Sequence, residues 1–421
     1  MGLDLSSRDR EMLDGRHGPA AAMAMSIVAR MAEVCGADRL LDITAAHIDS
    51  TIYVGDATLE FAERLAGLGA KVAVPSTLNV SGVDEHGWQE WAVPADWARK
   101  AHRQMVAYQS MGTTPIWTCA PYQAGARPAL GQQVAWGESN AIAFANSVLG
   151  ARTERYPDLL DICCAITGRA PAVGLHLDAP RAATLLLRLV DVPRRVQEDD
   201  AFYPVLGCLM GHLAEDEVPV IDGLSVVPSE DQLKAVCAAG ATTGRVALFH
   251  IAGVTPEAPT LQAACRGGRP RREVAVTMAD LREWRARLST TSSASLDLVV
   301  LGSPHFSLDE FRRLAPLVAG RRRHPDVRFL VTTSRLVRDL AEGAGLLRPL
   351  AEFGATLTVD TCILATPMLP PDIRTLMTNS AKFAYYTPGL LGREVVFGSL
   401  DDCVDSAVAG RVVTDLSGWD D

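Results

Sequence analysis

The chain has 421 residues, of which 48% are hydrophobic and 21% charged, as in an ordinary globular protein with room for two or three domains. Its net charge of −10 argues against nucleic acid or an anionic membrane as the main partner. A polar N-terminal stretch and the lack of an apolar run of about 18 residues predict a cytoplasmic protein without a leader or a membrane span. Nine cysteines without a C-x-x-C pair are typical of free thiols or metal ligands.

The first part of the chain alternates between strand-like and helix-like patterns. Apolar runs at residues 39–47, 70–79 and 114–122 predict strands that lead into loops. Helical patterns at 57–69 and 96–112 each end at a glycine, which is the usual helix stop. This order is typical of βα units, in which parallel strands are joined by helices.

The second part repeats this alternation with stronger strand signals. Residues 245–253, 296–305, 327–335 and 355–362 form near-continuous apolar runs, as expected for strands buried on both faces. Ser307 and Glu310 have the spacing of a capping box, which predicts a helix after the second of these strands. The fold class is therefore predicted to be α/β, with several parallel sheets flanked by helices.

Two segments interrupt the alternation and predict domain boundaries. One is charged and unpatterned near residues 191–202, and the other, at 253–274, is rich in proline, glycine and arginine. They predict an N-terminal α/β region at 1–195, a middle α/β region at 196–270 and a C-terminal α/β region at 271–421. The N-terminal region carries three strand-end loops, at 44–47, 76–79 and 118–125.

Polar side chains gather at the predicted strand ends, where α/β proteins bind their ligands. His47 closes an apolar run and is a candidate general base, although a lone histidine there is more often a satisfied loop residue. Lys382 offers a fixed positive charge for a carboxylate or phosphate; the alternative is a solvated helix face. The candidate substrate-binding residues are Ser76, Thr77, Asn79, Ser334, Arg335, Asn379 and Ser380.

Two cysteines stand at similar places. Cys119 and Cys362 each follow a threonine at the end of an apolar run. Two thiolates at strand ends are suited to share one iron–sulfur cluster, whereas either cysteine alone is more often a small buried hydrophobe. Cys163 lies in a helical pattern that favours core packing.

Several segments taken together resemble a known family. They include "ITAAHIDSTIY", "MGTTPIWTCAPYQAG", "AWGESNAIAFANSVLGART", "LGSPHFSLDE", "DTCILATPM" and "MTNSAKFAYYTPGLLG". In this order they resemble aconitase X, a divergent branch of the aconitase superfamily. The resemblance runs from about residue 6 to the C-terminus. It implies an aconitase-like multi-domain architecture and an iron–sulfur hydro-lyase that removes water from a small hydroxy acid.

The resemblance also implies roles for individual residues. Cys119 and Cys362 fall on cluster cysteines of the family. From their own chemistry, Lys382 joins His47 as a catalytic candidate for such a reaction. Ser303 stands where one branch has a third cysteine, so either Cys163 is the third ligand or the ligation is altered. The cluster is expected to be [2Fe–2S], [3Fe–4S] or [4Fe–4S].

The resemblance finally implies a partner and a substrate. The family's small swivelling domain has no counterpart in the matched segments, which implies a separate small subunit in a heterodimer. That subunit is the alternative source of the base. "GSPHFS" and "TTSR" are closer to the branch that converts cis-3-hydroxy-L-proline to 1-pyrroline-2-carboxylate. Mevalonate 5-phosphate, another hydroxy acid, or a catalytically lapsed iron–sulfur or interaction protein are the alternatives.

Overall fold

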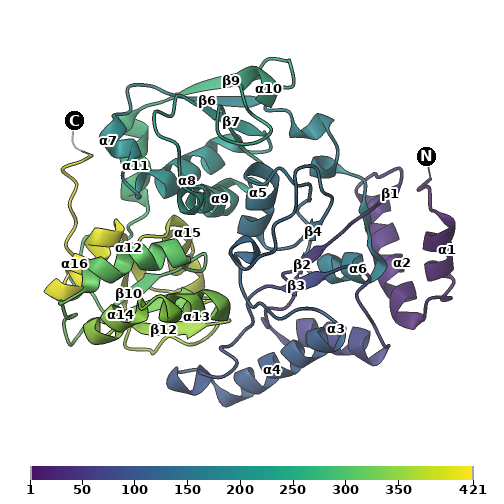
Figure 1. Cartoon of the computed structure of the whole chain (residues 1–421), viewed down its shortest axis with the longest axis horizontal. Coiled ribbons are helices and arrows are strands. Elements are labelled where there is room, and N and C mark those ends of the chain that lie inside the picture. Colours follow the sequence, from purple (N-terminus) through teal and green to yellow (C-terminus); the bar gives the residue numbers. More distant parts are fainter. Residues whose placement is uncertain (1, 420–421) are drawn as a thin grey trace.

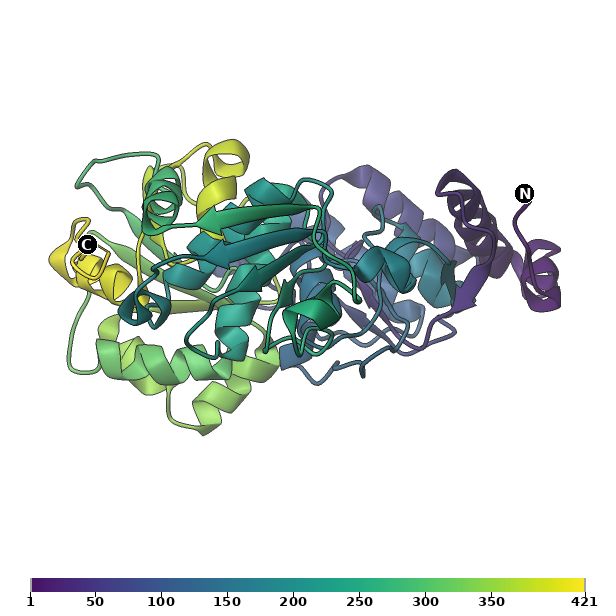
Figure 2. The ribbon, with the colours of Figure 1, turned by 90° about the horizontal axis from the view of Figure 1, so that it is seen from above.

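Most strands lie in three parallel sheets in the computed structural model, which describes residues 2–419 (Figure 1). The α/β class and the several parallel sheets predicted from the sequence are confirmed. The ribbon is elongated, and its N-terminal and C-terminal parts lie at opposite ends (Figures 1 and 2).

The C-terminal part is built on a five-stranded parallel sheet of order β12–β11–β10–β13–β14. Its three predicted strands are present; β10 and β11 are almost completely buried, whereas β12, at the edge of the sheet, is buried only in its second half. The strands are β10 (Leu298–Leu301), β11 (Arg328–Thr333), β12 (Thr356–Val359), β13 (Thr375–Thr378) and β14 (Glu394–Phe397).

The middle part holds a four-stranded parallel sheet of order β8–β7–β6–β9. Its first strand precedes residue 196, at which the sequence places the start of the middle region. The strands are β6 (Leu185–Leu189), β7 (Pro219–Asp222), β8 (His250–Ile251) and β9 (Arg272–Val276).

The N-terminal part departs most from the predicted strands. The run at 39–47 is divided, because β1 (Leu40–Asp42) pairs antiparallel with β5 (Arg169–Pro171), whereas β2 (Ala46–Ile48) pairs parallel with β3 (Ser76–Leu78) and β4 (Ala135–Trp136). The run at 114–122 forms no strand and makes a single bridge, between Thr77 and Thr114. Pro115 lacks an N–H group, and Trp117 has a φ of 41°, so the ladder cannot continue.

Helices cover the sheets, and α12, α13 and α14 lie together on one side of the C-terminal part (Figure 2). The capping box of Ser307 and Glu310 begins α12, as predicted. No helix among residues 2–419 has the length and apolarity to cross a bilayer. The α-helices are α1 (Ser7–Leu13), α2 (Pro19–Val34), α3 (Asp56–Gly67), α4 (Ala95–Ser110), α5 (Ser139–Ser147), α6 (Leu160–Thr167), α7 (Arg194–Gln197), α8 (Phe202–Ala214), α9 (Glu230–Gly244), α10 (Leu261–Ala264), α11 (Met278–Arg287), α12 (Leu308–Val318), α13 (Arg335–Gly343), α14 (Leu347–Phe353), α15 (Ala381–Tyr386) and α16 (Leu400–Ala409).

The loops after β3 and β12 bring the N-terminal and C-terminal sheets together. The backbone N–H of Ser81 donates to the carbonyl oxygen of Asp360 at 2.6 Å. In return, the Thr361 hydroxyl donates to the carbonyl oxygen of Ser81 at 3.3 Å. Because both loops follow the carboxyl ends of parallel strands, their polar side chains meet between the two sheets.

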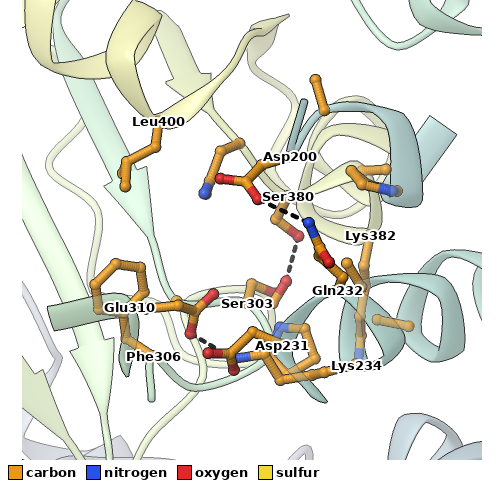
Figure 3. A pocket seen from close by; sticks show the side chains of 18 of the residues that line it. Asp200, Asp231, Gln232, Lys234, Ser303, Phe306, Glu310, Ser380, Lys382 and Leu400 are labelled. Carbon is orange, nitrogen blue, oxygen red and sulfur yellow. Dashed lines mark hydrogen bonds and ion pairs between the residues drawn. The ribbon is translucent and has the colours of Figure 1, made fainter. Parts of the chain in front are cut away.

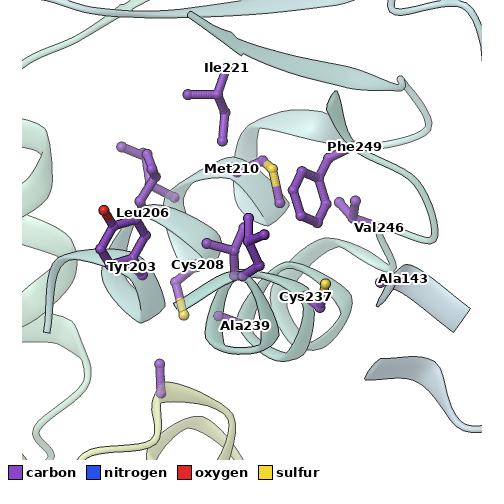
Figure 4. Packing of buried hydrophobic residues seen from close by; sticks show 14 of the residues in the cluster. Ala143, Tyr203, Leu206, Cys208, Met210, Ile221, Cys237, Ala239, Val246 and Phe249 are labelled. Atoms are coloured by element: carbon purple, nitrogen blue, oxygen red, sulfur yellow. The ribbon is translucent and has the colours of Figure 1, made fainter. Parts of the chain in front are cut away.

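Helices α8 and α9 approach each other closely through glycines. A Cβ atom at Gly207 would lie 2.8 Å from the Val236 carbonyl oxygen, and one at Gly211 would lie 2.7 Å from that of Gly240. Apolar side chains such as Met210 close over this contact in the core (Figure 4). The backbones therefore pack directly against each other, with no space for a side chain.

We expect Gly211→Ala to destabilise the protein by about 1–3 kcal/mol, since the added methyl group overpacks this contact. The control is Gly343→Ala, at a helical glycine with no atom within 4 Å of the added Cβ. Thermal melts of both variants test this expectation. An unchanged Tm for Gly211→Ala would show that the two helices have room to separate.

Candidate active site

A cavity of about 240 Å³ lies where the strand-end loops of the N-terminal and C-terminal sheets meet. The loops after β2 and β3 contribute Asp49 and Asn79 to its lining, and Glu138, the N-cap residue of α5, also lines it. The loops after β10 and β12 form the opposite wall, together with α15. Acidic, basic, amide and thiol groups thus converge on one small space.

Cys119 and Cys362 both line this cavity. The backbone N–H of His305 donates to Cys119 Sγ at 3.3 Å, and the backbone N–H groups of Leu364 and Ala365 donate to the Cys362 thiol. Burial raises the pKa of Cys119 to about 12, while the Lys382 ammonium opposes this rise. The same two influences act on Cys362, whose pKa is also raised. Backbone N–H donors and a nearby cation stabilise the thiolate form, so they oppose the rise in pKa that burial causes.

The structure does not bring Cys163 to these two thiols. Cys163 lies within α6 and packs in the hydrophobic core with Ile162 and Ala165. Burial raises its pKa far above the usual thiol range, which is typical of an inert core cysteine. Ser303 does line the cavity. Within residues 2–419, no three His, Cys, Asp or Glu side chains are arranged to hold a metal ion.

Lys382 reaches the cavity from the first turn of α15 and pairs with Glu138 at 2.8 Å. Their side chains are only 15% and 6% exposed. Glu138 is held in place because it caps α5, accepting a hydrogen bond from the N–H of Ala141. Burial alone would lower the pKa of Lys382, but Glu138 and the two cavity thiols outweigh it and raise the pKa. Lys382 is therefore a firmly charged ammonium group.

Asp49 is the second carboxylate of the cavity, and it accepts a hydrogen bond from the Asn79 amide. Burial is the main cause that raises its pKa to about 8, and the charge of Glu138 adds to the shift. A carboxyl group that titrates near neutral pH is suited to accept or release a proton during a reaction. The sequence analysis missed Asp49, although it lies two residues after His47 in the segment "AAHIDS".

The other predicted residues of the first sheet do not line the cavity. His47 is completely buried, and its Nδ1 atom lies 2.8 Å from the Thr77 hydroxyl. Burial lowers the pKa of His47 to about 3, so it stays neutral near pH 7. The Ser76 hydroxyl donates to the carbonyl oxygen of Val74. These side chains support the loop that carries Asn79.

Ser334 and Arg335 also lie outside the cavity lining. The Ser334 hydroxyl caps α13 by accepting from the N–H of Val337. Arg335 pairs with Asp360 and Glu85, so its charge is already compensated by two carboxylates. It therefore braces the loop that leads to Cys362.

Asn379 and Ser380 line a neighbouring cavity instead (Figure 3). The Ser380 hydroxyl donates to the carbonyl oxygen of Ser303, and Lys382 borders both cavities. Gly302 and Ser303 also line both cavities.

Sequence models of three aconitase X domains match this chain. The first domain matches residues 2–179, the second 183–286 and the third 296–409. A solved structure, the holo-form of Thermococcus kodakaraensis aconitase X, superposes with a TM-score of 0.85 at 30% identity, covering 96% of this chain and 100% of that one.

Named relatives support the same assignment. The chain is 50% identical over 418 residues to cis-3-hydroxy-L-proline dehydratase of Pseudomonas aeruginosa, covering 99% of this chain and 72% of that one. It is 47% identical to the enzyme of that name from Hypocrea jecorina, covering 100% and 71%. It is 37% identical to the phosphomevalonate dehydratase large subunit of Methanothermobacter thermautotrophicus, covering 93% and 96%. The resemblance inferred from the sequence is confirmed, and the chain belongs to the aconitase X family.

Proposed function

We propose that this chain is the large, cluster-bearing part of a dehydratase that converts cis-3-hydroxy-L-proline to 1-pyrroline-2-carboxylate. The observation that carries the proposal is the cavity in which Cys119, Cys362, Lys382 and Asp49 converge. The 50% and 47% identities to two proteins named for this activity support the choice of substrate.

The charges in the cavity favour this substrate over mevalonate 5-phosphate. Among the described residues that line the cavity, Lys382 is the only lysine or arginine, whereas Asp49 and Glu138 are both acidic. Mevalonate 5-phosphate carries a phosphate ester as well as its carboxylate, which together bring more negative charge than one ammonium group balances. Hydroxyproline carries one carboxylate and one secondary ammonium group, which suits a cavity of mixed charge.

An iron–sulfur centre fits the two cavity thiols. Cys119 and Cys362 share one space, and backbone N–H groups already donate to their sulfur atoms. Two thiols are fewer than the four of a standard [2Fe–2S] or [4Fe–4S] site, so the cluster would keep open or non-thiolate positions. When bound, an iron with an open position would act as a Lewis acid toward the departing hydroxyl group.

The residues of this chain have separate tasks in the proposed reaction. Lys382 binds the substrate carboxylate, which places C2 and C3 within the cavity. Asp49 accepts the proton from C2 while the hydroxyl group leaves C3, so that one molecule of water is lost. The resulting enamine tautomerises to 1-pyrroline-2-carboxylate. Asn79 holds Asp49 in position through its amide hydrogen bond.

We infer that a separate small subunit completes the active site. The chain spans 96% and 98% of two relatives named as large subunits, a name that implies a smaller partner. It spans 72% and 71% of the two hydroxyproline dehydratases, which are longer. A cytoplasmic location is part of the proposal, supported by nine cysteines that are all free thiols.

The test is an anaerobic purification after co-expression with a family small subunit, followed by iron and sulfide quantification. Formation of 1-pyrroline-2-carboxylate from cis-3-hydroxy-L-proline is the expected result, with mevalonate 5-phosphate as the comparison substrate. Turnover of mevalonate 5-phosphate alone would overturn the choice of substrate. A stable complex without iron and without either activity would favour a catalytically lapsed interaction protein.

We expect Asp49→Asn to lower kcat by about 100-fold or more, since an amide cannot accept the C2 proton. A base must be unprotonated, so wild-type activity should rise with pH as the Asp49 carboxyl, whose pKa is about 8, loses its proton. The pH profile of kcat/KM for both proteins tests this. The residual activity of Asp49→Asn should not rise with pH in this way. If the profile of Asp49→Asn rises as the wild-type profile does, the rise belongs to a group other than Asp49.

A further inference from the structure

His305 connects the two segments that carry the cavity cysteines. Its Nδ1 atom lies 3.0 Å from the hydroxyl oxygen of Thr118, and its Nε2 atom lies 3.0 Å from the carbonyl oxygen of Thr361. These threonines directly precede Cys119 and Cys362. One rigid imidazole ring thus spans the backbone beside both thiols, although the two segments are far apart in the sequence.

The hydrogen bonds define how the ring is protonated. The carbonyl oxygen of Thr361 only accepts, so Nε2 carries the hydrogen and Nδ1 accepts from the Thr118 hydroxyl. The Thr118 oxygen in turn accepts from the backbone N–H of Ala120 at 3.2 Å, which leaves its own hydrogen for His305. Each donor in this series of hydrogen bonds therefore has one acceptor.

The backbone of His305 is fixed from two further sides. Its N–H donates to Cys119 Sγ at 3.3 Å, and its carbonyl oxygen accepts from Lys234 at 3.3 Å. Lys234, from α9, is nearly buried and pairs with Asp231 at 3.0 Å and with Glu310 (Figure 3). The middle part of the chain thereby anchors the loop that holds His305.

Because of these hydrogen bonds, the His305 imidazole has no ring nitrogen free for another role. Both ring nitrogens are engaged by neighbouring groups, so neither is available to bind iron or to take a proton from the substrate. The His305 ring therefore acts as a fixed spacer with one hydrogen-bond donor and one hydrogen-bond acceptor.

We propose that His305 is a positioning residue that sets the spacing of the Cys119 and Cys362 thiols through hydrogen bonds to Thr118 and Thr361. The iron-binding part of this inference rests on the proposed function, whereas the spacing of the thiols does not. Removing a group that hydrogen-bonds to a metal ligand and orients it commonly lowers metal affinity about 10- to 100-fold.

The matched pair Thr118→Val and Thr118→Ser tests the first hydrogen bond. Valine keeps the shape of threonine without the hydroxyl group, and serine keeps the hydroxyl group. We expect Thr118→Val to weaken Cd²⁺ binding by the apo-protein about 10- to 100-fold, measured by thiolate-to-cadmium absorption, and Thr118→Ser to bind as the wild type does. The Cys119→Ser, Cys362→Ser double variant supplies the blank for the other thiols.

His305→Phe removes both ring hydrogen bonds and should have the larger effect, while His305→Gln, whose amide nitrogen replaces Nε2, should retain part of the affinity. In the anaerobically loaded protein, we expect the iron content to fall and the electron paramagnetic resonance spectrum to shift in Thr118→Val. Wild-type Cd²⁺ affinity and an unchanged spectrum in both Thr118→Val and His305→Phe would overturn the proposal. A wild-type protein that binds no iron, but whose Cd²⁺ affinity depends on Thr118, would refute the proposed cofactor and support the role of His305.

Discussion

Replacing Cys119 and Cys362 together with serine is expected to remove the iron and lower dehydration at least about 100-fold. Both sulfur atoms line the same cavity, and each already accepts backbone N–H hydrogen bonds. A serine hydroxyl has a far higher pKa than a thiol, so it does not replace a thiolate ligand near neutral pH. Iron and sulfide content per chain, together with kcat/KM, measure the effect.

The matched control for this double variant is Cys35→Ser, because Cys35 is exposed and lies outside the cavity lining. It should retain wild-type iron content and activity. Each single variant should keep one thiol and lose most of the iron, since one ligand holds a cluster poorly. Full iron content in the double variant would exclude these cysteines as ligands.

Lys382→Met is expected to lower kcat/KM by roughly 30- to 4,000-fold, which corresponds to about 2–5 kcal/mol for the loss of a buried charged partner. The change removes the cation that the proposed mechanism assigns to the substrate carboxylate. It also leaves Glu138, only 6% exposed, without its ion-pair partner. Steady-state kinetics and thermal melts of the same preparation separate the two consequences.

The double variant Lys382→Met, Glu138→Gln distinguishes structure from function. It removes both charges of the buried pair, so its Tm should recover toward the wild-type value while its activity stays low. Lys100→Met is the control, because Lys100 pairs with Asp56, whose side chain is 58% exposed, outside the cavity lining. Recovery of activity in the double variant would show that Lys382 serves only to neutralise Glu138.

Local signals in the sequence were strongest in the C-terminal part. Long apolar runs predicted β10, β11 and β12, and for β10 and β11 the reason is that a strand buried on both faces needs apolar residues at nearly every position. The spacing of Ser307 and Glu310 predicted the start of α12, because capping depends only on residues within one helical turn.

The same signals failed around Cys119. Its apolar neighbours predicted a strand, yet the segment is held by packing, and Trp117 has a left-handed backbone conformation. The pairing of β1 with β5 also divided a run that the sequence presents as one strand. Strand pairing depends on partners far along the chain, which periodicity does not reveal.

The sequence by itself determined the α/β class and singled out Cys119, Cys362 and Lys382 as candidate site residues. Only the tertiary structure decided which of these side chains share a cavity. It placed Asp49 there, and it placed His47 and Cys163 in buried surroundings away from it. The physical reason is that a side chain's neighbours and burial, which set its pKa and its access to a ligand, arise from the meeting of two sheets distant in sequence.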